Sequence, residues 1–308
     1  MADAAGGINR YPDFAATVLS ALIAERVDAS VEAIALGTGS VALLQHALEI
    51  MCDDGDEVIY AWRSFEAYPI VTRITGAVPV EVPLTADHRH DLAAMAKAVN
   101  ERTRVIILCS PNNPTGTVVE PVELEAFMRD VPSDVLVILD EAYVEFVDEH
   151  RRADAVGLVH AHRNLCVLRT FSKAYGLAGV RLGYAIADHD VADALRAVST
   201  PFGISSPAQA AGSAVLAPAA ADELASRIAY LRAERHRVID ALGDFAAADP
   251  QGNFIWCPLA ERAEDFAQVC AVNGLSVRAF AGEGVRATIA ETPANDRLIA
   301  LAQEFDRS

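Results

Sequence analysis

Residues 169–181 indicate the fold of this chain most directly, and they read Arg169-Thr-Phe-Ser-Lys-Ala-Tyr-Gly-Leu-Ala-Gly-Val-Arg181. The stretch follows the apolar run 165–168, which has the character of a buried strand. Within it lies Lys173, one of only two lysines among 308 residues. The other, Lys97, belongs to a helical stretch at a spacing that faces water. Because lysine can lose its proton in a protein and arginine cannot, Lys173 is a candidate for Schiff-base chemistry with a carbonyl.

The neighbours of Lys173 suit a phosphorylated cofactor. Ser172 and Arg181 can bind an anionic phosphate, and Gly176 and Gly179 allow a close approach of the backbone. This combination predicts a lysine that carries pyridoxal phosphate (PLP). The alternative is a solvated loop lysine beside a serine and an arginine that are there by chance.

The composition narrows the classes of partner. The net charge is -18, so an acidic surface argues against nucleic acid and against an anionic membrane. The five cysteines are scattered without a CxxC pair, which predicts buried thiols in a reducing compartment and no metal site. No apolar run has the length of a membrane span, and the N-terminus lacks a signal-peptide pattern. We therefore expect a cytoplasmic protein.

Short apolar runs alternate with helix-period stretches through the first two thirds of the chain. The candidate strands are residues 33–36, 57–62, 78–84, 104–110, 135–141, 165–171 and 181–187. Helix-period stretches such as 41–51, 91–100 and 122–129 lie between them. This alternation predicts an α/β fold, in which a large domain holds a mostly parallel seven-stranded sheet between helices.

The last third has a different pattern. A long helix-period stretch, 219–242, precedes three short strand candidates, 253–256, 276–280 and 286–289, and helices at 263–272 and 293–305. We expect a small α+β C-terminal domain here. The predicted organisation is an N-terminal segment at 1–13, a large cofactor-binding domain at 14–213, and a small domain at 214–308 that begins with the bridging helix.

A phosphate needs backbone N–H groups at the start of a helix. Residues 37–40, Gly37-Thr-Gly-Ser40, follow a strand and open the helix at Val41, so they supply that geometry. The stretch also matches a dinucleotide-binding fingerprint, which requires an acidic residue at the end of the next strand. Asp56 and Glu57 precede that strand, so they stand at the wrong end for this alternative.

The ring of PLP needs partners at its nitrogen and at its 3-oxygen. Asp140 ends an apolar strand, where a buried carboxylate can keep the pyridine nitrogen protonated, whereas Glu141 points to the opposite face. A helix N-cap is the alternative role for Asp140. Asn113 follows the strand that ends at Ser110, and Tyr143 lies three residues past Asp140, so both can reach the oxygen.

Together these residues resemble the fold-type-I PLP aminotransferases, in the branch of the histidinol-phosphate and aromatic-amino-acid enzymes. The motifs that carry the resemblance are Asn9-Arg-Tyr-Pro-Asp13, Asn112-Asn-Pro-Thr-Gly116, Asp140-Glu-Ala-Tyr143, Ser172-Lys-Ala-Tyr-Gly-Leu-Ala-Gly-Val-Arg181 and Gly284-Val-Arg286. They occur in family order over nearly the whole chain. Gly37-Thr-Gly-Ser-Val-Ala-Leu43 and Trp62-Arg-Ser-Phe-Glu-Ala-Tyr68 look like the phenylalanine (aromatic) subgroup, since the histidinol-phosphate enzymes usually have an acidic residue in place of Val41.

The resemblance implies a role for each matching residue. Lys173 would hold the cofactor and shuttle the proton, Asp140 would pair with the ring nitrogen, and Asn113 and Tyr143 would bind the 3-oxygen. Phe65 would stack on the ring, and Arg286 would grip the substrate carboxylate. Ser172, Arg181 and the N–H groups of Ser40 and Val41 would bind the phosphate. Tyr11 would reach the phosphate of a neighbouring subunit, which implies an obligate homodimer with a shared active site.

The resemblance also implies the reaction, a transamination of an aromatic L-amino acid with 2-oxoglutarate by a ping-pong course. We expect Trp62, Phe65 and Tyr68 near the cofactor as an apolar wall. Histidinol phosphate stays open as the donor, because Arg63 or Arg278 could bind its phosphate. A PLP-dependent decarboxylase is a further alternative. Only residues 1–8 precede the Arg-Tyr-Pro motif, where the family has an arm over the active site, so a weakly active or non-catalytic remnant is the last alternative.

Overall fold

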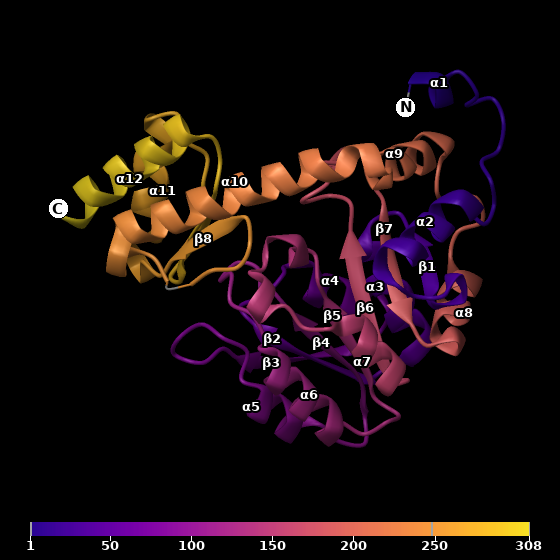
Figure 1. Ribbon diagram of the computed structural model, residues 1–308. Coiled ribbons are helices and arrows are strands. Elements are labelled where there is room, and N and C mark those ends of the chain that lie inside the picture. Colours follow the sequence, from indigo (N-terminus) through magenta and orange to yellow (C-terminus); the bar gives the residue numbers. More distant parts are fainter. Residues whose placement is uncertain (1, 248, 308) are drawn as a thin grey trace.

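The computed structural model describes residues 2–247 and 249–307. Met1 of the predicted N-terminal segment, and Ala248 and Ser308 of the predicted C-terminal domain, lie outside the described residues. Figure 1 shows a large sheet with helices on both of its faces, and a smaller unit that the long helix α10 joins to it. Within the described ranges, no helix combines the length and the apolar character that a membrane crossing requires.

The large sheet has seven strands within the described residues, in the order β1-β7-β6-β5-β4-β2-β3. Its strands are β1 (Ile34–Gly37), β2 (Glu57–Trp62), β3 (Val78–Pro83), β4 (Thr103–Cys109), β5 (Leu136–Asp140), β6 (Leu165–Thr170) and β7 (Gly183–Ala187). Strands β2 to β6 pair in parallel, whereas β7 pairs antiparallel with both β1 and β6. The predicted mostly parallel seven-stranded sheet is confirmed.

Helices cover both faces of this sheet. The helices that precede the bridging helix are α1 (Ala2–Ala5), α2 (Thr17–Val27), α3 (Ser40–Met51), α4 (Ala67–Ile74), α5 (Leu92–Ala98), α6 (Pro121–Asp130), α7 (Ala155–Ala161), α8 (His189–Val198) and α9 (Ser206–Leu216). Helices α2, α5, α6 and α7 pack on one face, and α3, α4 and α8 pack on the other.

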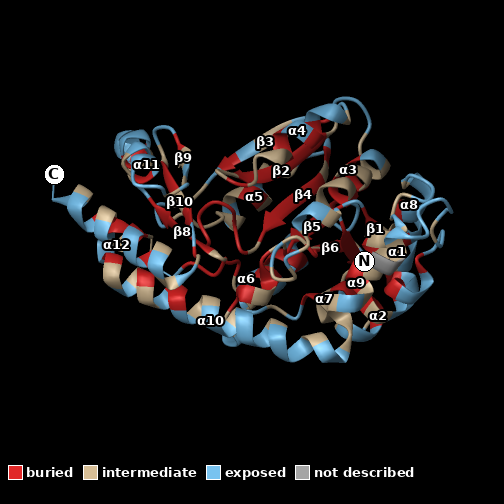
Figure 2. Ribbon diagram, turned by 90° about the horizontal axis from the view of Figure 1, so that it is seen from above, coloured by how far each residue is buried: buried red, intermediate tan, exposed pale blue. Residues whose placement is uncertain are grey.

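Strand residues alternate between these two faces. On β4, Ile106 and Leu108 contact the first group of helices, while Val105 and Ile107 contact the second. This is the two-residue period of a strand that is buried on both sides. Figure 2 shows the consequence, a sheet with buried central strands inside a shell of partly exposed helices.

The C-terminal part has its own core. Its elements are α10 (Pro218–Leu242), β8 (Phe254–Cys257), α11 (Ala263–Val272), β9 (Arg278–Phe280), β10 (Gly284–Thr288) and α12 (Thr292–Asp306). The three strands form an antiparallel sheet in the order β8-β10-β9, which packs against α10, α11 and α12. The small α+β unit predicted from the sequence is therefore present. The boundary predicted between residues 213 and 214 falls within α9, and the division into domains stays a prediction.

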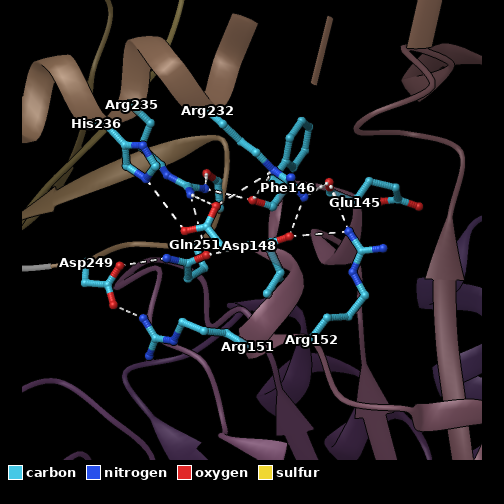
Figure 3. Close-up of polar contacts among 12 residues, drawn as sticks. Glu145, Phe146, Asp148, Arg151, Arg152, Arg232, Arg235, His236, Asp249 and Gln251 are labelled. Carbon is cyan, nitrogen blue, oxygen red and sulfur yellow. Dashed lines mark hydrogen bonds and ion pairs between the residues drawn. The ribbon is translucent and has the colours of Figure 1, made fainter. Parts of the chain in front are cut away.

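A buried polar cluster, which we call the joint, connects α10 to the segment after β5 (Figure 3). Arg235 on α10 is fully buried and donates to Phe146 O at 2.9 Å, Gly252 O at 3.1 Å and Asp148 Oδ1 at 3.3 Å. Gln251 accepts from the Asp148 N–H at 2.9 Å and donates its own N–H to Gly116 O at 2.7 Å. The joint thus fixes two segments of the chain to one guanidinium, and Gln251 attaches the loop at Gly116 to them.

Candidate active site

The predicted site residues meet at the carboxyl edge of the large sheet. A cavity of about 380 Å³ lies there, where the ends of β1, β2, β4, β5 and β6 face the small antiparallel sheet. Parallel strands bring their carboxyl ends to one edge, which is where open α/β sheets place ligands. The cavity is lined by ten of the predicted site residues, namely Ser40, Val41, Phe65, Asn113, Asp140, Tyr143, Ser172, Lys173, Arg181 and Arg286.

One wall of the cavity is built to receive an anion. Helix α3 begins at Ser40, directly after Gly39, whose φ of 93° favours glycine. A side chain at Gly39 would place a Cβ atom 2.5 Å from the Arg181 guanidinium, and one at Gly183 would place it 2.5 Å from the Ser40 nitrogen. These two glycines therefore let the arginine and the N–H groups at the start of the helix approach each other.

Ser172 completes this wall. Thr170, the last residue of β6, donates its hydroxyl to Ser172 Oγ at 2.9 Å and accepts from the Ser172 N–H at 3.1 Å. These bonds orient the serine side chain at the cavity, two residues after the strand ends.

Lys173 lies beside the Tyr143 ring, with Nζ 5.2 Å from its centroid. Burial lowers the pKa of Lys173 from its usual value, and the positive charges of Arg286 and Arg181 lower it further, although Asp140 opposes them. A lowered pKa makes the neutral amine more available for nucleophilic chemistry. Lys97, by contrast, is exposed on α5, as its spacing predicts.

Asp140 is a buried carboxylate at the floor of the cavity. It accepts from Tyr68 Oη at 2.9 Å and from the Ala142 N–H at 3.2 Å. Burial raises the pKa of Asp140 to about 6, against the lowering effect of these bonds. Glu141 instead pairs with Arg169 at 2.8 Å.

The part played by Tyr68 was not found from the sequence, which placed this residue in an apolar wall. Tyr68 is fully buried and holds Asp140. Its place one helical turn past Phe65 was the available signal, but a bond between residues so far apart in the chain requires the folded structure.

Arg286 is a residue of the small sheet that lines the cavity. It lies on β10 and donates from Nη1 to Asn113 Oδ1 at 2.5 Å, and its guanidinium stacks on the Phe254 ring at 5.2 Å. Arg286 Nε is buried without a hydrogen-bond partner among the described residues. A buried donor of this kind is suited to a ligand carboxylate.

Besides Arg278, six lining residues were not predicted as site residues, namely Glu66, Cys109, Ala142, Thr170, Ala178 and Phe280. Phe280 stands two residues after Arg278 on β9, so the strand period that directs one side chain to the cavity directs the other there too. Arg278, which the sequence left open as a phosphate ligand, also lines the cavity and is paired with Glu66 at 2.7 Å. Among the described residues that line the cavity, Trp62 and Tyr68 do not appear, so the expected aromatic wall is reduced to Phe65.

Tyr11 stands apart from the other predicted site residues. It is 83% exposed and packs on Phe202, with ring centroids 4.9 Å apart. It is not among the described residues that line the cavity of its own chain. This placement is compatible with the expectation that Tyr11 acts at a neighbouring subunit.

The residues of this cavity fit PLP. An arginine and the N–H groups of a helix start match a phosphate, a buried carboxylate matches a ring nitrogen, and a buried lysine with a lowered pKa matches the aldehyde. The unpaired Nε of Arg286 leaves a donor for a substrate acid.

Comparison with known proteins agrees with this chemistry. The chain is 51% identical over 307 residues to an aromatic amino acid aminotransferase of Streptomyces avermitilis, covering 99% of this chain and 85% of that protein. It is 50% identical to an enzyme of the same name from Mycobacteroides abscessus, covering 99% and 87%. Among solved structures, a histidinol-phosphate aminotransferase of Sinorhizobium meliloti in complex with pyridoxal-5'-phosphate is similar, with a TM-score of 0.89, 26% identity and coverage of 98% and 86%.

The model of the aminotransferase class I and II family matches residues 2–302, nearly the whole chain. A family match of this extent shows the class of reaction and the cofactor, and the residues that line the cavity fit that cofactor. The chain belongs to the class I and II aminotransferases, and it is a transferase that uses PLP.

Proposed function

We propose that this protein transfers the amino group of an aromatic L-amino acid, phenylalanine or tyrosine, to 2-oxoglutarate. One observation carries the proposal. Arg286 and Phe280 lie on neighbouring strands of the small sheet, and both line the cavity. In the register, Arg286 faces Arg278, and Phe280 follows two residues later on the same face. Such diagonal neighbours lie about 7–8 Å apart. Arg286 can therefore bind the carboxylate at one end of a substrate while Phe280 contacts an aromatic ring at its other end. The names of the half-identical relatives support the same donor.

We propose roles for the residues around the reacting atoms. When bound, PLP supplies an electron sink for the substrate α-carbon. Lys173 holds the cofactor, and its amine takes and returns the proton of the α-carbon. Asp140 keeps the ring nitrogen protonated, and Tyr68 holds the Asp140 carboxylate in place. Arg286 binds the substrate carboxylate with two N–H groups.

The remaining lining residues would position the cofactor. We propose that Ser172, Arg181 and the N–H groups of Ser40 and Val41 bind its phosphate, since these residues meet at the start of α3. Asn113 and Tyr143 would donate to the 3-oxygen, and Phe65 would stack on the ring.

We also propose a homodimer in which Tyr11 serves the partner's cofactor. An exposed aromatic cluster supports it, in which Tyr11 and Phe14 both pack on Phe202 and all three rings are exposed. Exposed apolar patches of this kind mark interaction sites. Mixing Tyr11→Phe with Lys173→Ala subunits tests the proposal, because each mixed dimer would hold one site with both defects and one intact site. Activity that does not rise above that of the parent variants contradicts it.

The proposal places the protein in the cytoplasm and divides it into a large domain at 14–213 and a small domain at 214–308. All five cysteines are free thiols, as in a reducing compartment. The separate core of the C-terminal part supports the second domain.

Histidinol phosphate is the second candidate donor, because Arg278 lines the cavity and the Sinorhizobium meliloti structure is similar. A screen of amino donors, followed by the change in visible absorbance of the bound cofactor, decides between them. We expect phenylalanine or tyrosine to react with a higher kcat/KM than histidinol phosphate. Faster reaction with histidinol phosphate would refute the aromatic assignment and leave the aminotransferase class intact.

A further inference from the structure

Two ion pairs, which we call the mouth pairs, cross between the two sheets beside the cavity. Arg278 on β9 pairs with Glu66, which precedes α4, and the distance from Nη2 to Oε2 is 2.7 Å. Arg63, just after β2, pairs with Glu283, and the distance from Nε to either carboxylate oxygen is 3.0 Å. In each pair one partner lies in the segment between β2 and α4, and the other lies on β9 or in the turn between β9 and β10.

Cationic side chains outnumber carboxylates in the lining of the cavity, and not all of these charges have a proposed role toward the cofactor or the substrate. The cationic lining residues are Lys173, Arg181, Arg278 and Arg286, and the carboxylates are Glu66 and Asp140. Under the proposed function, three of the cations and Asp140 already have roles toward the cofactor or the substrate carboxylate. Arg278 has none, and Glu66 is its ion-pair partner.

The place of Arg278 makes this pairing matter for selectivity. On the small sheet Arg278 faces Arg286, and Phe280 lies beside it on the same face. An unpaired arginine here would attract a second acidic group on the substrate side chain. A carboxylate that neutralises it removes that attraction and leaves the Phe280 ring as the dominant contact for a side chain.

We propose that Glu66 is a specificity-determining residue, which masks Arg278 so that the pocket favours uncharged, aromatic side chains over anionic ones. The proposal rests on the proposed function for the direction of the substrate in the cavity. Both side chains are about half exposed, 58% for Arg278 and 46% for Glu66, so little free energy is needed to separate them. A dicarboxylic acceptor can therefore still enter, by displacing Glu66 from Arg278.

The test compares two simple acids that lack an amino group and so only bind. Glutarate has a second carboxylate, whereas 3-phenylpropanoate has a ring. We would titrate each into the PLP-loaded protein by calorimetry, at low ionic strength because salt screens exposed charges. In Glu66→Gln the affinity for glutarate relative to 3-phenylpropanoate should rise about three- to tenfold, the range of a charge-assisted contact at a partly exposed site.

Two further variants separate masking from a general loosening of the mouth. In an Arg278→Met background, Glu66→Gln should no longer raise the relative affinity for glutarate, because the arginine that it unmasks is absent. Glu283→Gln is the matched control, since it breaks the other mouth pair and Glu283 is not among the described residues that line the cavity. It should change both affinities by the same factor.

An unchanged ratio in Glu66→Gln, including an absence of glutarate binding, overturns the proposal. So does an equal shift in Glu283→Gln, or a shift that survives Arg278→Met. Because the readout is binding, it stands apart from turnover. A shifted ratio together with no reaction of aromatic donors would refute the proposed function alone, and aromatic turnover with an unchanged ratio would refute the masking alone.

Discussion

The joint and the mouth pairs both connect the large sheet to the C-terminal part, but they do so under opposite conditions. At the joint, Arg235 has no exposed surface, and two of its partners are main-chain carbonyl oxygens. At the mouth, Arg278 and Glu66 are about half exposed, and the ion pair joins one side chain to the other. Breaking the buried contact leaves polar groups without partners away from water and therefore costs more free energy, whereas water competes for both partners of the exposed pair. The joint is therefore the stronger of the two contacts, and we expect the mouth pairs to break more easily.

The largest expected effect concerns Lys173, which belongs to neither the joint nor the mouth pairs. Lys173→Ala should abolish turnover and should leave no PLP attached to the protein after borohydride reduction. Mass spectrometry of the reduced wild-type protein should find the label on Lys173. The exposed Lys97 is the internal control, and label there would contradict the assignment.

Breaking the joint should have the next largest effect, this time on stability. Arg235→Met leaves the Phe146 and Gly252 carbonyl oxygens without this donor and removes a buried partner of Asp148. We expect a loss of about 3–5 kcal/mol in the free energy of unfolding, as for one partner of a buried ion pair, measured by urea denaturation.

Arg227→Met on the same helix is the matched control for the joint. Arg227 is 68% exposed and pairs with Glu223 one turn away, so its loss should change stability by less than about 0.5 kcal/mol. Similar losses in the two variants would show that the joint is no stronger than a surface pair.

An intermediate effect is expected at Asp140. Tyr68→Phe removes a donor that lowers the pKa of Asp140, so this pKa should rise above its value of about 6. The ionised carboxylate that binds the ring nitrogen then becomes scarcer as the pH falls. PLP affinity should drop about three- to tenfold near pH 6, the range of one hydrogen bond, and by less near pH 8.

Tyr60→Phe serves as the control for Tyr68→Phe. Tyr60 is also buried, and its hydroxyl bonds to Glu81 at 3.3 Å, outside the cavity. The pH dependence of PLP binding, followed by visible absorbance, should match the wild type in this control. An equal loss near pH 6 and near pH 8 in Tyr68→Phe would contradict the role of ionisation.

The smallest effect should follow from the mouth pairs. Glu283→Gln and Glu66→Gln should each lower the free energy of unfolding by less than about 1 kcal/mol, because the pairs are partly solvated. Arg63 also keeps its stacking on Trp62, 4.4 Å from the ring centroid. Denaturation in low and high salt measures this, and a loss as large as that of Arg235→Met would erase the contrast between the two contacts.

The strands of both sheets were predictable because their apolar runs are short and sharply bounded, as at Leu165–Thr170. The direction of β7 was not drawn from the sequence, although the short link from Thr170 to Gly183 leaves little room for the crossover helix of a parallel pair. Helix α9 was also not identified. Ser205, which caps it by accepting from the Ala208 N–H, and Pro207 in its first turn were its available signals.

The place of a residue at the cavity was predictable where a strand end or a motif specified it, as for Asp140 and Lys173. Glu66 and Tyr68 were not, because their roles depend on partners that lie 212 and 72 residues away. Such pairings follow from the packing of the two parts, and sequence periodicity describes only each element by itself.

Arg235 lies near the C-terminal end of α10, so a rotation of the helix around this buried contact has a short radius on that side. The helix has 25 residues, but only residues 236–242 extend past the point where Arg235 ties it to the large sheet. At a rise of 1.5 Å per residue, this segment, which packs in the core of the C-terminal part, is about 10 Å long. A rotation of about 10° around Arg235 would move its end by about 2 Å, roughly the gap that admits a water molecule into an ion pair. The short segment past this buried contact therefore keeps the displacement of the C-terminal end of α10 small for any given rotation.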